Sequence, residues 1–316
     1  METVHIKING TSYEVAAGST ILEAAHSVGI EIPTLCYLKE INAIGACRIC
    51  VVEVKGARSL VTACVYPVNE GMEVVTNSEK VMAARKTNLE LLLSTHDQNC
   101  LSCVRSTDCE LQRLCRGYGV NGQRFVGSRE RYALDASAPH MIRDNNKCIL
   151  CRRCVATCEK VQNIGVIGTN ERGFYTSIGS PFGMGLGETS CVSCGQCVSV
   201  CPTGALQERT TMIKETPVDT VETDTTCSYC SVGCSLKLES YGDMLIKANP
   251  DKQGTVNAGL ACGKGKWGFD CSMLENKLEE PLIKSGSDFR EADYHEALVL
   301  IAKRCQSIGA KYGKDA

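Results

Sequence analysis

Cysteine spacing is the feature that most constrains this chain. Nineteen of its 22 cysteines, together with His96, fall into five groups of four that follow one another along the sequence. The groups are Cys36, Cys47, Cys50 and Cys64; His96, Cys100, Cys103 and Cys109; Cys148, Cys151, Cys154 and Cys158; Cys191, Cys194, Cys197 and Cys201; and Cys227, Cys230, Cys234 and Cys262. Thiolate and imidazole side chains at such short, repeated spacings are typical of metal ligands. We therefore expect a chain that folds around a series of metal centres.

Two other kinds of cysteine-rich protein are possible alternatives: a secreted protein held by disulfides and a zinc protein. Residues 1–8 contain no basic segment followed by an apolar run, so no secretory signal is visible. No window approaches 18 consecutive apolar residues, so we expect no membrane span. These observations favour a cytoplasmic protein with reduced thiols. A scaffold without redox function, with zinc in its sites, is kept as an alternative.

Length, composition and charge limit the architecture and the partners. A chain of 316 residues exceeds the usual size of one core, so we expect several domains. Aromatic residues make up only 5% of the chain, which predicts small cores whose folding depends on the bound metal. The net charge of −2 provides no basic face for nucleic acid or anionic lipid. Partners are therefore expected to be proteins.

The first segment has clear local structure. Residues 4–15 alternate between apolar and polar types around an Asn-Gly dipeptide, which predicts a β-hairpin. Thr20 and Glu23 then form a capping-box pair that begins a helix, and Gly29 is expected to follow its end.

The first cysteine group follows this helix with the spacing C-x10-C-x2-C-x13-C. It contains one short pair, whereas structural zinc sites usually draw on two, so iron is favoured. The segment resembles the [2Fe–2S] domain of the β-grasp ferredoxin type. Its spacing is longer than in plant ferredoxins and is similar to the variant in complex I and related hydrogenases.

The second group follows residues 79–93, which have the apolar spacing of a helix with one buried face that includes Met82. The spacing H-x3-C-x2-C-x5-C lets one neutral imidazole and three thiolates complete a [4Fe–4S] cluster. Replacing a thiolate by His96 removes negative charge, so this cluster need not share the potential of its all-cysteine neighbours. The residues after Cys109 resemble the complex I and hydrogenase subunits that carry such a His/Cys3 cluster. Cys115 is a local competitor, which we expect to be a buried thiol.

The third and fourth groups repeat one pattern, C-x2-C-x2-C-x3-C, which indicates an internal duplication. In two-cluster ferredoxins the fourth cysteine of each run binds the other cluster. We therefore predict two [4Fe–4S] sites, held by Cys148, Cys151, Cys154 and Cys201 and by Cys191, Cys194, Cys197 and Cys158. Residues 178–188, between the runs, are rich in glycine but lack a Walker or dinucleotide motif, so we expect a mobile loop. Nucleotide and flavin chemistry is expected in partners.

The fifth group has the spacing C-x2-C-x3-C-x27-C, which matches no common zinc finger. It resembles the N-terminal [4Fe–4S] domain of molybdopterin oxidoreductases, and residues 262–265 are similar to the C-x-K-G motif of that family. The resemblance implies that Lys264 lies between the cluster and the pterin. Residues 292–308 form an amphipathic pattern like the helix that begins the pterin-binding domain. Catalytic residues would then lie outside these 316 residues.

The predicted fold class is α+β, as a chain of small iron–sulfur domains. The expected domains are 1–78, a β-grasp [2Fe–2S] domain; 79–136, a His/Cys3 [4Fe–4S] domain; 137–215, a 2[4Fe–4S] ferredoxin domain; 216–285, a molybdopterin-oxidoreductase-type [4Fe–4S] domain; and 286–316, the start of a pterin-binding domain. Cys115, Cys271 and Cys305 have no assigned role and are expected to be buried.

This order of clusters resembles the α subunit of cytoplasmic NAD-dependent formate dehydrogenases. The resemblance implies one [2Fe–2S] and four [4Fe–4S] clusters that carry single electrons between a molybdenum or tungsten pterin site and a flavin. The implied partners are an FMN- and NAD-binding diaphorase-type subunit, a small [2Fe–2S] subunit, a catalytic pterin domain or hydrogenase subunit, and ferredoxin. The alternative is an electron-connecting subunit of a cytoplasmic, bifurcating hydrogenase or a complex I-like dehydrogenase with no pterin site.

Overall fold

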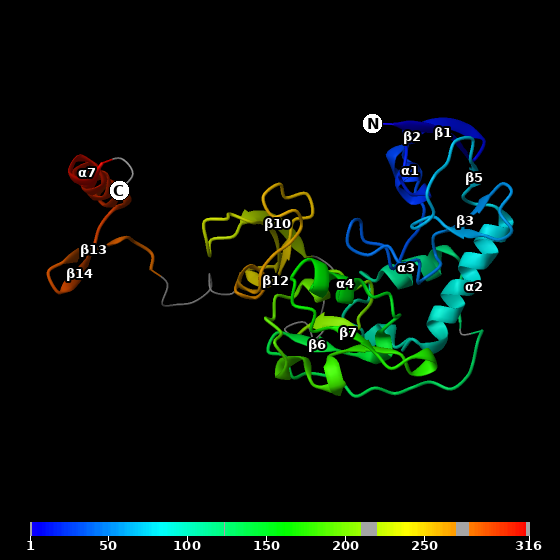
Figure 1. Ribbon diagram of the computed structural model, residues 1–316. Coiled ribbons are helices and arrows are strands. Elements are labelled where there is room, and N and C mark those ends of the chain that lie inside the picture. Colours follow the sequence, from blue (N-terminus) through cyan, green and yellow to red (C-terminus); the bar gives the residue numbers. More distant parts are fainter. Residues whose placement is uncertain (1, 123, 210–219, 270–277, 314–316) are drawn as a thin grey trace. The chain divides into compact units, whose positions relative to one another are not determined.

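The computed structural model describes residues 2–122, 124–209, 220–269 and 278–313. The chain divides into two compact units, Met1–Trp267 and Gly268–Ala316 (Figure 1). Helices and strands are mixed along both units, as the predicted α+β class requires. Among the described helices, none is long and apolar enough to cross a membrane.

The first sheet is built around the predicted hairpin. Its strands, in the order β2-β1-β5-β3-β4, are β1 (Thr3–Ile8), β2 (Thr11–Ala16), β3 (Val51–Val54), β4 (Val61–Thr62) and β5 (Glu73–Val75). β1 and β2 are antiparallel, and β1 and β5 are parallel. Asn9 and Gly10 have φ angles of 52° and 86°, which a two-residue turn of type I′ needs. The predicted hairpin is confirmed.

Helix α1 (Ile21–Ser27) covers this sheet and begins at the predicted capping box. Thr20 Oγ1 accepts a hydrogen bond from the Glu23 N–H at 3.2 Å, and the Glu23 carboxylate accepts one from the Thr20 N–H at 2.9 Å. Gly29 follows the end of the helix with a φ of 77°. The first core contains apolar residues of α1 and the sheet together with Cys50 and Cys64. Two of the predicted ligands of the first group are therefore part of the hydrophobic core.

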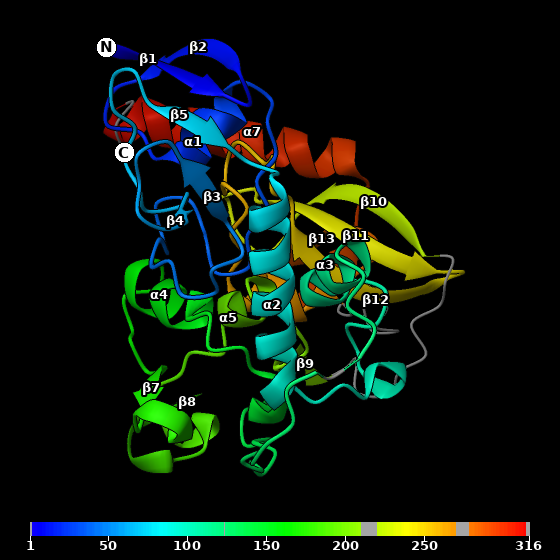
Figure 2. The same ribbon diagram turned by 90° about the vertical axis from the view of Figure 1, so that its right-hand side faces the viewer.

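Helix α2 (Glu79–Thr95) extends away from the first sheet (Figures 1 and 2), and the short elements η1 (Cys100–Ser102) and α3 (Glu110–Gly117) follow. The predicted helix is confirmed, but its buried face differs from the expectation. Met82 is 39% exposed, whereas Arg85 is fully buried in the stripe between Val81 and Leu89. These three residues are four apart and therefore share one face of the helix, from which Met82 is rotated away.

The third segment contains two short helices and paired short strands. Helices α4 (Arg153–Lys160) and α5 (Gln196–Ser199) each begin within one cysteine run, and β6 (Met141–Arg143) pairs antiparallel with β9 (Leu206–Glu208). The residues between the runs form β7 (Gly168–Asn170) and β8 (Ser177–Gly179), which are also antiparallel. Short 3₁₀ turns complete this segment: η2 (Asn145–Lys147), η3 (Gly173–Tyr175), η4 (Pro181–Gly183) and η5 (Leu186–Glu188).

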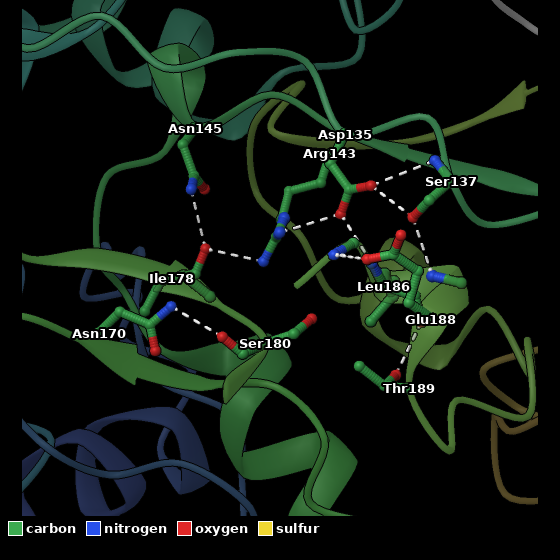
Figure 3. A network of polar contacts seen from close by, with 12 residues as sticks. Asp135, Ser137, Arg143, Asn145, Asn170, Ile178, Ser180, Leu186, Glu188 and Thr189 are labelled. Atoms are coloured by element: carbon green, nitrogen blue, oxygen red, sulfur yellow. Dashed lines mark hydrogen bonds and ion pairs between the residues drawn. The ribbon is translucent and has the colours of Figure 1, made fainter. Parts of the chain in front are cut away.

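Residues 178–188, for which the sequence predicted a mobile loop, form hydrogen bonds within a polar network (Figure 3). Asp135 accepts from the Arg143 guanidinium at 2.9 Å and from the Leu186 N–H at 3.0 Å. Ser137 Oγ accepts from the Gly187 N–H at 2.9 Å. A Cβ on Gly187 would lie 2.3 Å from the Ser137 carbonyl oxygen, so this glycine permits the close approach. These partners are distant in sequence, which is why the pattern alone indicated a free loop.

The fourth segment forms an antiparallel sheet of β10 (Val221–Thr226), β11 (Ser235–Tyr241) and β12 (Met244–Pro250), followed by α6 (Gly263–Trp267). The second unit contains the hairpin of β13 (Leu282–Ser285) and β14 (Asp288–Glu291) and helix α7 (Tyr294–Tyr312). The helix predicted over 292–308 is thus confirmed. Cys305 lies exposed on α7, contrary to the expectation of a buried thiol, because nothing in the described part of this unit covers it.

Candidate iron–sulfur centres

The first group converges in the interior beside the first sheet. All four of its cysteines are buried, and the 47–50 turn and the turn after β4 carry three of them. Hydrogen bonds from the thiols of Cys47 and Cys64 lower the pKa of Cys36, helped by the backbone N–H groups of Cys47 and Ala46. Cys64 in turn contacts Cys50. Four sulfurs in mutual contact, with backbone donors aimed at one of them, fit a cluster that binds thiolates.

Gly45 allows the chain to wrap closely around this group. It has a φ of 61°, and an added Cβ would lie 3.4 Å from Thr62 Oγ1 and 3.5 Å from Val65 Cγ2. The neighbouring Arg48 also has a positive φ, of 56°. Left-handed backbone on either side of Cys47 turns successive N–H groups toward the sulfurs.

His96 caps the C-terminal end of α2 and is 7% exposed. Burial lowers the pKa of its imidazole to about 4, and the charges of Arg129 and Lys147 act in the same direction while Asp97 opposes them. The ring is therefore neutral at pH 7. Its Nδ1 atom is buried and has no hydrogen-bond partner in the described part of the chain. A buried, neutral and unpaired imidazole nitrogen fits a metal ligand.

The three cysteines that accompany His96 lie on η1 and at the start of α3. The turn after Cys201 packs against them. Cys109 Sγ lies 3.7 Å from the Pro202 carbonyl oxygen, and a Cβ on Gly204 would lie 2.6 Å from Cys103 Sγ. The second group therefore touches the turn that follows Cys201, which is a predicted ligand in the third segment. Sequence reasoning missed Gly204, because no spacing rule links it to Cys103.

Cys115 is buried as predicted. Burial raises the pKa of its thiol to about 11, with smaller contributions from Cys109 and Cys100. The contributions of Cys109 and Cys100 show that Cys115 lies close to the second group. That Cys115 is not an iron ligand stays a prediction. Cys271 lies outside the described residues.

The two duplicated runs adopt the same local backbone. Leu150 and Ser193, at matching positions, have φ angles of 54° and 50°. Each donates its backbone N–H at 3.4 Å to the sulfur two residues before it, Cys148 or Cys191. This repeat geometry supports the internal duplication inferred from spacing.

The structure places the fourth cysteine of each run beside the opposite run. Burial raises the pKa values of Cys148, Cys151 and Cys154, and the charge of Cys201 adds to the increase at each. Burial also raises the pKa values of Cys194 and Cys197, to which Cys158 contributes. This arrangement brings together the thiols of each predicted ligand set, and the exchange of Cys158 and Cys201 stays a prediction.

A small pocket, partly open to solvent, lies at the second of these two sites. Its lining includes the complete predicted ligand set, namely Cys158, Cys191, Cys194 and Cys197. The rest of the wall is mainly apolar and includes Met141 and Ile164. Four thiols around an apolar pocket fit a [4Fe–4S] cluster, since each sulfur can bind a different iron.

The fifth group gathers where the second sheet meets α6. Burial raises the pKa of Cys234, and the charges of Cys227, Cys230 and Cys262 raise it further, so the four thiols are neighbours. Cys230 and Cys262 are exposed. A Cβ on Gly265 would lie 3.5 Å from Cys227 Sγ, so this sulfur lies against the helix.

The two lysines of α6 differ in environment. Lys264, which the sequence motif singled out, is exposed. Lys266 is only 2% exposed, and its Nζ lies 2.7 Å from Glu208 Oε1. Sequence reasoning missed Lys266, although the repeated lysine in Gly-Lys-Gly-Lys could have drawn attention to it.

Family models match four successive parts of the chain. A 2Fe-2S iron–sulfur cluster binding domain matches residues 1–79, and the NADH-ubiquinone oxidoreductase-G iron–sulfur binding region matches 85–124. A 4Fe-4S dicluster domain matches 147–205, and a molybdopterin oxidoreductase Fe4S4 domain matches 220–271. Together with the cysteine geometry, these matches define a multi-cluster iron–sulfur electron-transfer protein.

Whole-chain comparisons point to one family. An NADH-quinone oxidoreductase component of Rhizobium meliloti is 35% identical over 99% of this chain and 36% of its own length. The α subunit of the NADPH-Fe(3+) oxidoreductase of Geobacter sulfurreducens is 34% identical over 99% of this chain and 36% of its own length. A crystal structure of an NAD+-reducing [NiFe]-hydrogenase in the H2-reduced state covers 65% of this chain and 87% of its own, with a TM-score of 0.61 and 32% identity.

The chain belongs to the NADH-quinone oxidoreductase-G family, which includes related formate dehydrogenase-like proteins, and corresponds to their N-terminal iron–sulfur portion. It spans about a third of the length of the curated relatives that it matches. The predicted family, the chain of iron–sulfur domains and the electron-transfer role are thereby confirmed.

Proposed function

We propose that this chain is the electron-transfer portion of an NAD-linked formate dehydrogenase. In this proposal it carries single electrons between a pterin site with molybdenum or tungsten and a flavin on a partner subunit. One observation carries the proposal: the cysteine group of the molybdopterin oxidoreductase type follows the two ferredoxin-type groups along the chain and also contacts them, through the hydrogen bond from Trp267 to Ser193. A candidate formate dehydrogenase of Staphylococcus aureus, 28% identical over the whole chain, also supports it.

The proposed ligand sets follow the five groups, with the exchange of Cys158 and Cys201. They hold one [2Fe–2S] and four [4Fe–4S] clusters, which supply one-electron transfer when bound. The protein's own contribution is to fix the sulfurs, exclude water and direct backbone N–H groups at them. His96 contributes a neutral ligand from a buried position. The domain limits 1–78, 79–136, 137–215, 216–285 and 286–316 belong to the same proposal.

The proposed partners supply the two-electron chemistry. They are an FMN- and NAD-binding diaphorase-type subunit, a small [2Fe–2S] subunit and a pterin domain, with ferredoxin as a further acceptor. Lys264 is proposed to lie toward the pterin, and its exposed position beside Cys262 is compatible with that role. None of the 21 described cysteines forms a disulfide, which suits the reducing conditions of the cytoplasm, where we propose that the protein acts.

The second candidate function is a connector between a flavin subunit and a hydrogenase, without a pterin site. It is favoured by a subunit of an NADP-reducing hydrogenase of Solidesulfovibrio fructosivorans, which is 47% identical over 66% of this chain. A complex I-like dehydrogenase is a related possibility through the Rhizobium meliloti relative.

The deciding experiment is metal analysis and turnover of the complex purified anaerobically from its host. Iron, molybdenum, tungsten and nickel are counted against the subunit masses, and reduction of NAD is followed with formate and with hydrogen. Molybdenum or tungsten with formate-dependent reduction supports the formate dehydrogenase. Nickel, or iron alone, with hydrogen-dependent reduction supports the connector. Zinc in place of iron would overturn both proposals.

A further inference from the structure

Helix α6 is fastened to the loop between Cys191 and Cys197 by two hydrogen bonds. The Trp267 indole Nε1 donates to the Ser193 carbonyl oxygen at 2.6 Å. The Gln196 side-chain amide donates to the Ala261 carbonyl oxygen at 2.5 Å. The two bonds run in opposite directions across the contact, from the helix to the loop and from the loop to the helix. The fifth group is therefore anchored on the loop of the fourth.

Two glycines allow the backbones to touch at this contact. Gly195 has a φ of +73°, and an added Cβ would lie 2.5 Å from Trp267 Cζ2 and 2.6 Å from Lys266 Cδ. On the helix side, a Cβ on Gly263 would lie 3.0 Å from the Ser193 carbonyl oxygen and 3.7 Å from the Cα of Cys194. Because Gly263 directly follows Cys262, the backbones that carry these two cysteines lie against each other.

A buried ion pair completes the contact. Lys266 reaches from α6 to Glu208 on β9, and their side chains are only 2% and 7% exposed. The Lys266 ammonium also lies 5.2 Å from the centre of the Trp267 ring, which stacks on His140 at 5.5 Å. Burying two charges is costly unless their geometry is held well. Lys264, two residues earlier on α6, is exposed and takes no part in the pair.

We propose that Lys266 is a positioning residue that clamps α6 onto the Cys191–Cys197 loop. The clamp holds the Cys227 centre directly beside the centre of Cys158, Cys191, Cys194 and Cys197. These two centres are then direct electron partners, because the rate of an outer-sphere electron hop falls steeply with distance. The inference rests on the ligand sets of the proposed function, but not on formate as the substrate.

The test compares Lys266→Met with Lys264→Met in the cluster-loaded, full-length protein. Hydrogen exchange reports on the contact, and the magnetic interaction between the two dithionite-reduced centres reports on their separation. We expect Lys266→Met to speed amide exchange in residues 193–199 by about tenfold or more, because the variant loses the buried ion pair that joins α6 to β9. It should also weaken the magnetic interaction. Lys264→Met should match the wild type in both readouts.

Unchanged exchange and an unchanged magnetic interaction in Lys266→Met would overturn the clamp. If that variant loses iron, Glu208→Gln decides, because it removes the carboxylate charge that pairs with Lys266. An unchanged magnetic interaction in iron-replete Glu208→Gln would likewise contradict the proposal. Neither readout needs substrate, so absence of formate turnover would overturn the proposed function and leave the clamp standing.

Discussion

The Arg85 guanidinium donates a hydrogen bond of 2.9 Å to the carbonyl oxygen of Val51, the residue after Cys50. Arg85 is 1% exposed, and its other partners, Asn77 and Tyr118, are neutral. No carboxylate lies within 4 Å of it among the described residues. A buried charge without a counter-charge is strongly unfavourable. The first centre, whose thiolates are negative when iron is bound, is the neighbouring group that can balance Arg85.

Arg85→Met is therefore expected to make the midpoint potential of the first centre more negative. Reduction adds negative charge to the cluster, and the variant no longer offers a buried cation to balance it. Redox titration followed by electron paramagnetic resonance measures the shift. Lys86→Met, which changes an exposed charge on the same helix, is the control. An intact cluster with an unaltered potential in Arg85→Met would show that the charge is balanced elsewhere.

Cys201→Ser and Cys158→Ser are expected to damage opposite clusters. Cys201 lies with the first run and Cys158 with the second, so each substitution should alter the spectrum of the centre built mainly by the other run. Electron paramagnetic resonance of the reduced protein distinguishes the two outcomes. Cys115→Ser, which replaces a buried thiol outside both runs, should leave both signals unchanged. If Cys201→Ser instead removed the signal of the centre built by Cys191, Cys194 and Cys197, the predicted exchange of ligands between the two runs would be wrong.

Gly204→Ala should selectively disturb the His96 centre. The added methyl would approach to 2.6 Å of Cys103 Sγ, so the sulfur or the turn must move. We expect about 2 kcal/mol of destabilisation from overpacking and a changed signal from this centre. Thermal unfolding and electron paramagnetic resonance provide the two measurements. Gly127→Ala is a suitable control, because no atom lies within 4 Å of its added methyl.

Cys230→Ser should leave the first four centres intact but stop electron flow through the fifth. Cys230 is exposed and contributes to this group alone, so its loss should not disturb the other folds. Iron content and formate-to-NAD turnover test the two parts of this expectation. Undiminished turnover with the fifth signal missing would contradict the proposed route.

Asp135→Asn should destabilise the ferredoxin segment by about 2 kcal/mol, because it removes a largely buried ion pair with Arg143. Burial alone would raise the pKa of Asp135, but hydrogen bonds from Ser137 and Leu186, together with Arg143, lower it below 3.8. The carboxylate therefore contributes stability above pH 3.8, and this contribution is lost as the pH falls through its lowered pKa.

Thermal unfolding followed by cluster absorbance measures the difference between Asp135→Asn and the wild type. The difference should be largest near neutral pH. Asp243→Asn, at an exposed turn of the second sheet, should unfold like the wild type. Equal stability of Asp135→Asn and the wild type at pH 7 would mean that the network around residues 178–188 does not depend on the ion pair.

Local signals predicted the elements that depend on neighbouring residues. The hairpin, the capping box at Thr20 and the bounds of α2 and α7 follow from turn chemistry, capping and periodicity within a few residues. The matched cysteine runs belong to the same class, because their repeated spacing produces the same left-handed turns at Leu150 and Ser193.

Motif reasoning was weaker where the choice depended on which way a side chain points. It gave no sign of Lys266, which the structure turns inward to Glu208, while the role predicted for Lys264 stays a prediction. It counted Met82 into the buried face of α2, where the structure buries Arg85. Lys266 and Arg85 both have partners far away in sequence, and such pairs leave no local pattern.

By itself, the amino-acid sequence determined where the [2Fe–2S] and [4Fe–4S] domains lie along the chain, because ligand spacing is a local property. Only the tertiary structure decided how the centres of these domains are connected. Gly204 touches Cys103, Lys266 pairs with Glu208, and Arg85 is buried beside the first group. Such contacts depend on packing between segments that are distant in sequence. A glycine or lysine that joins two sites therefore looks, in the sequence, the same as one that faces solvent.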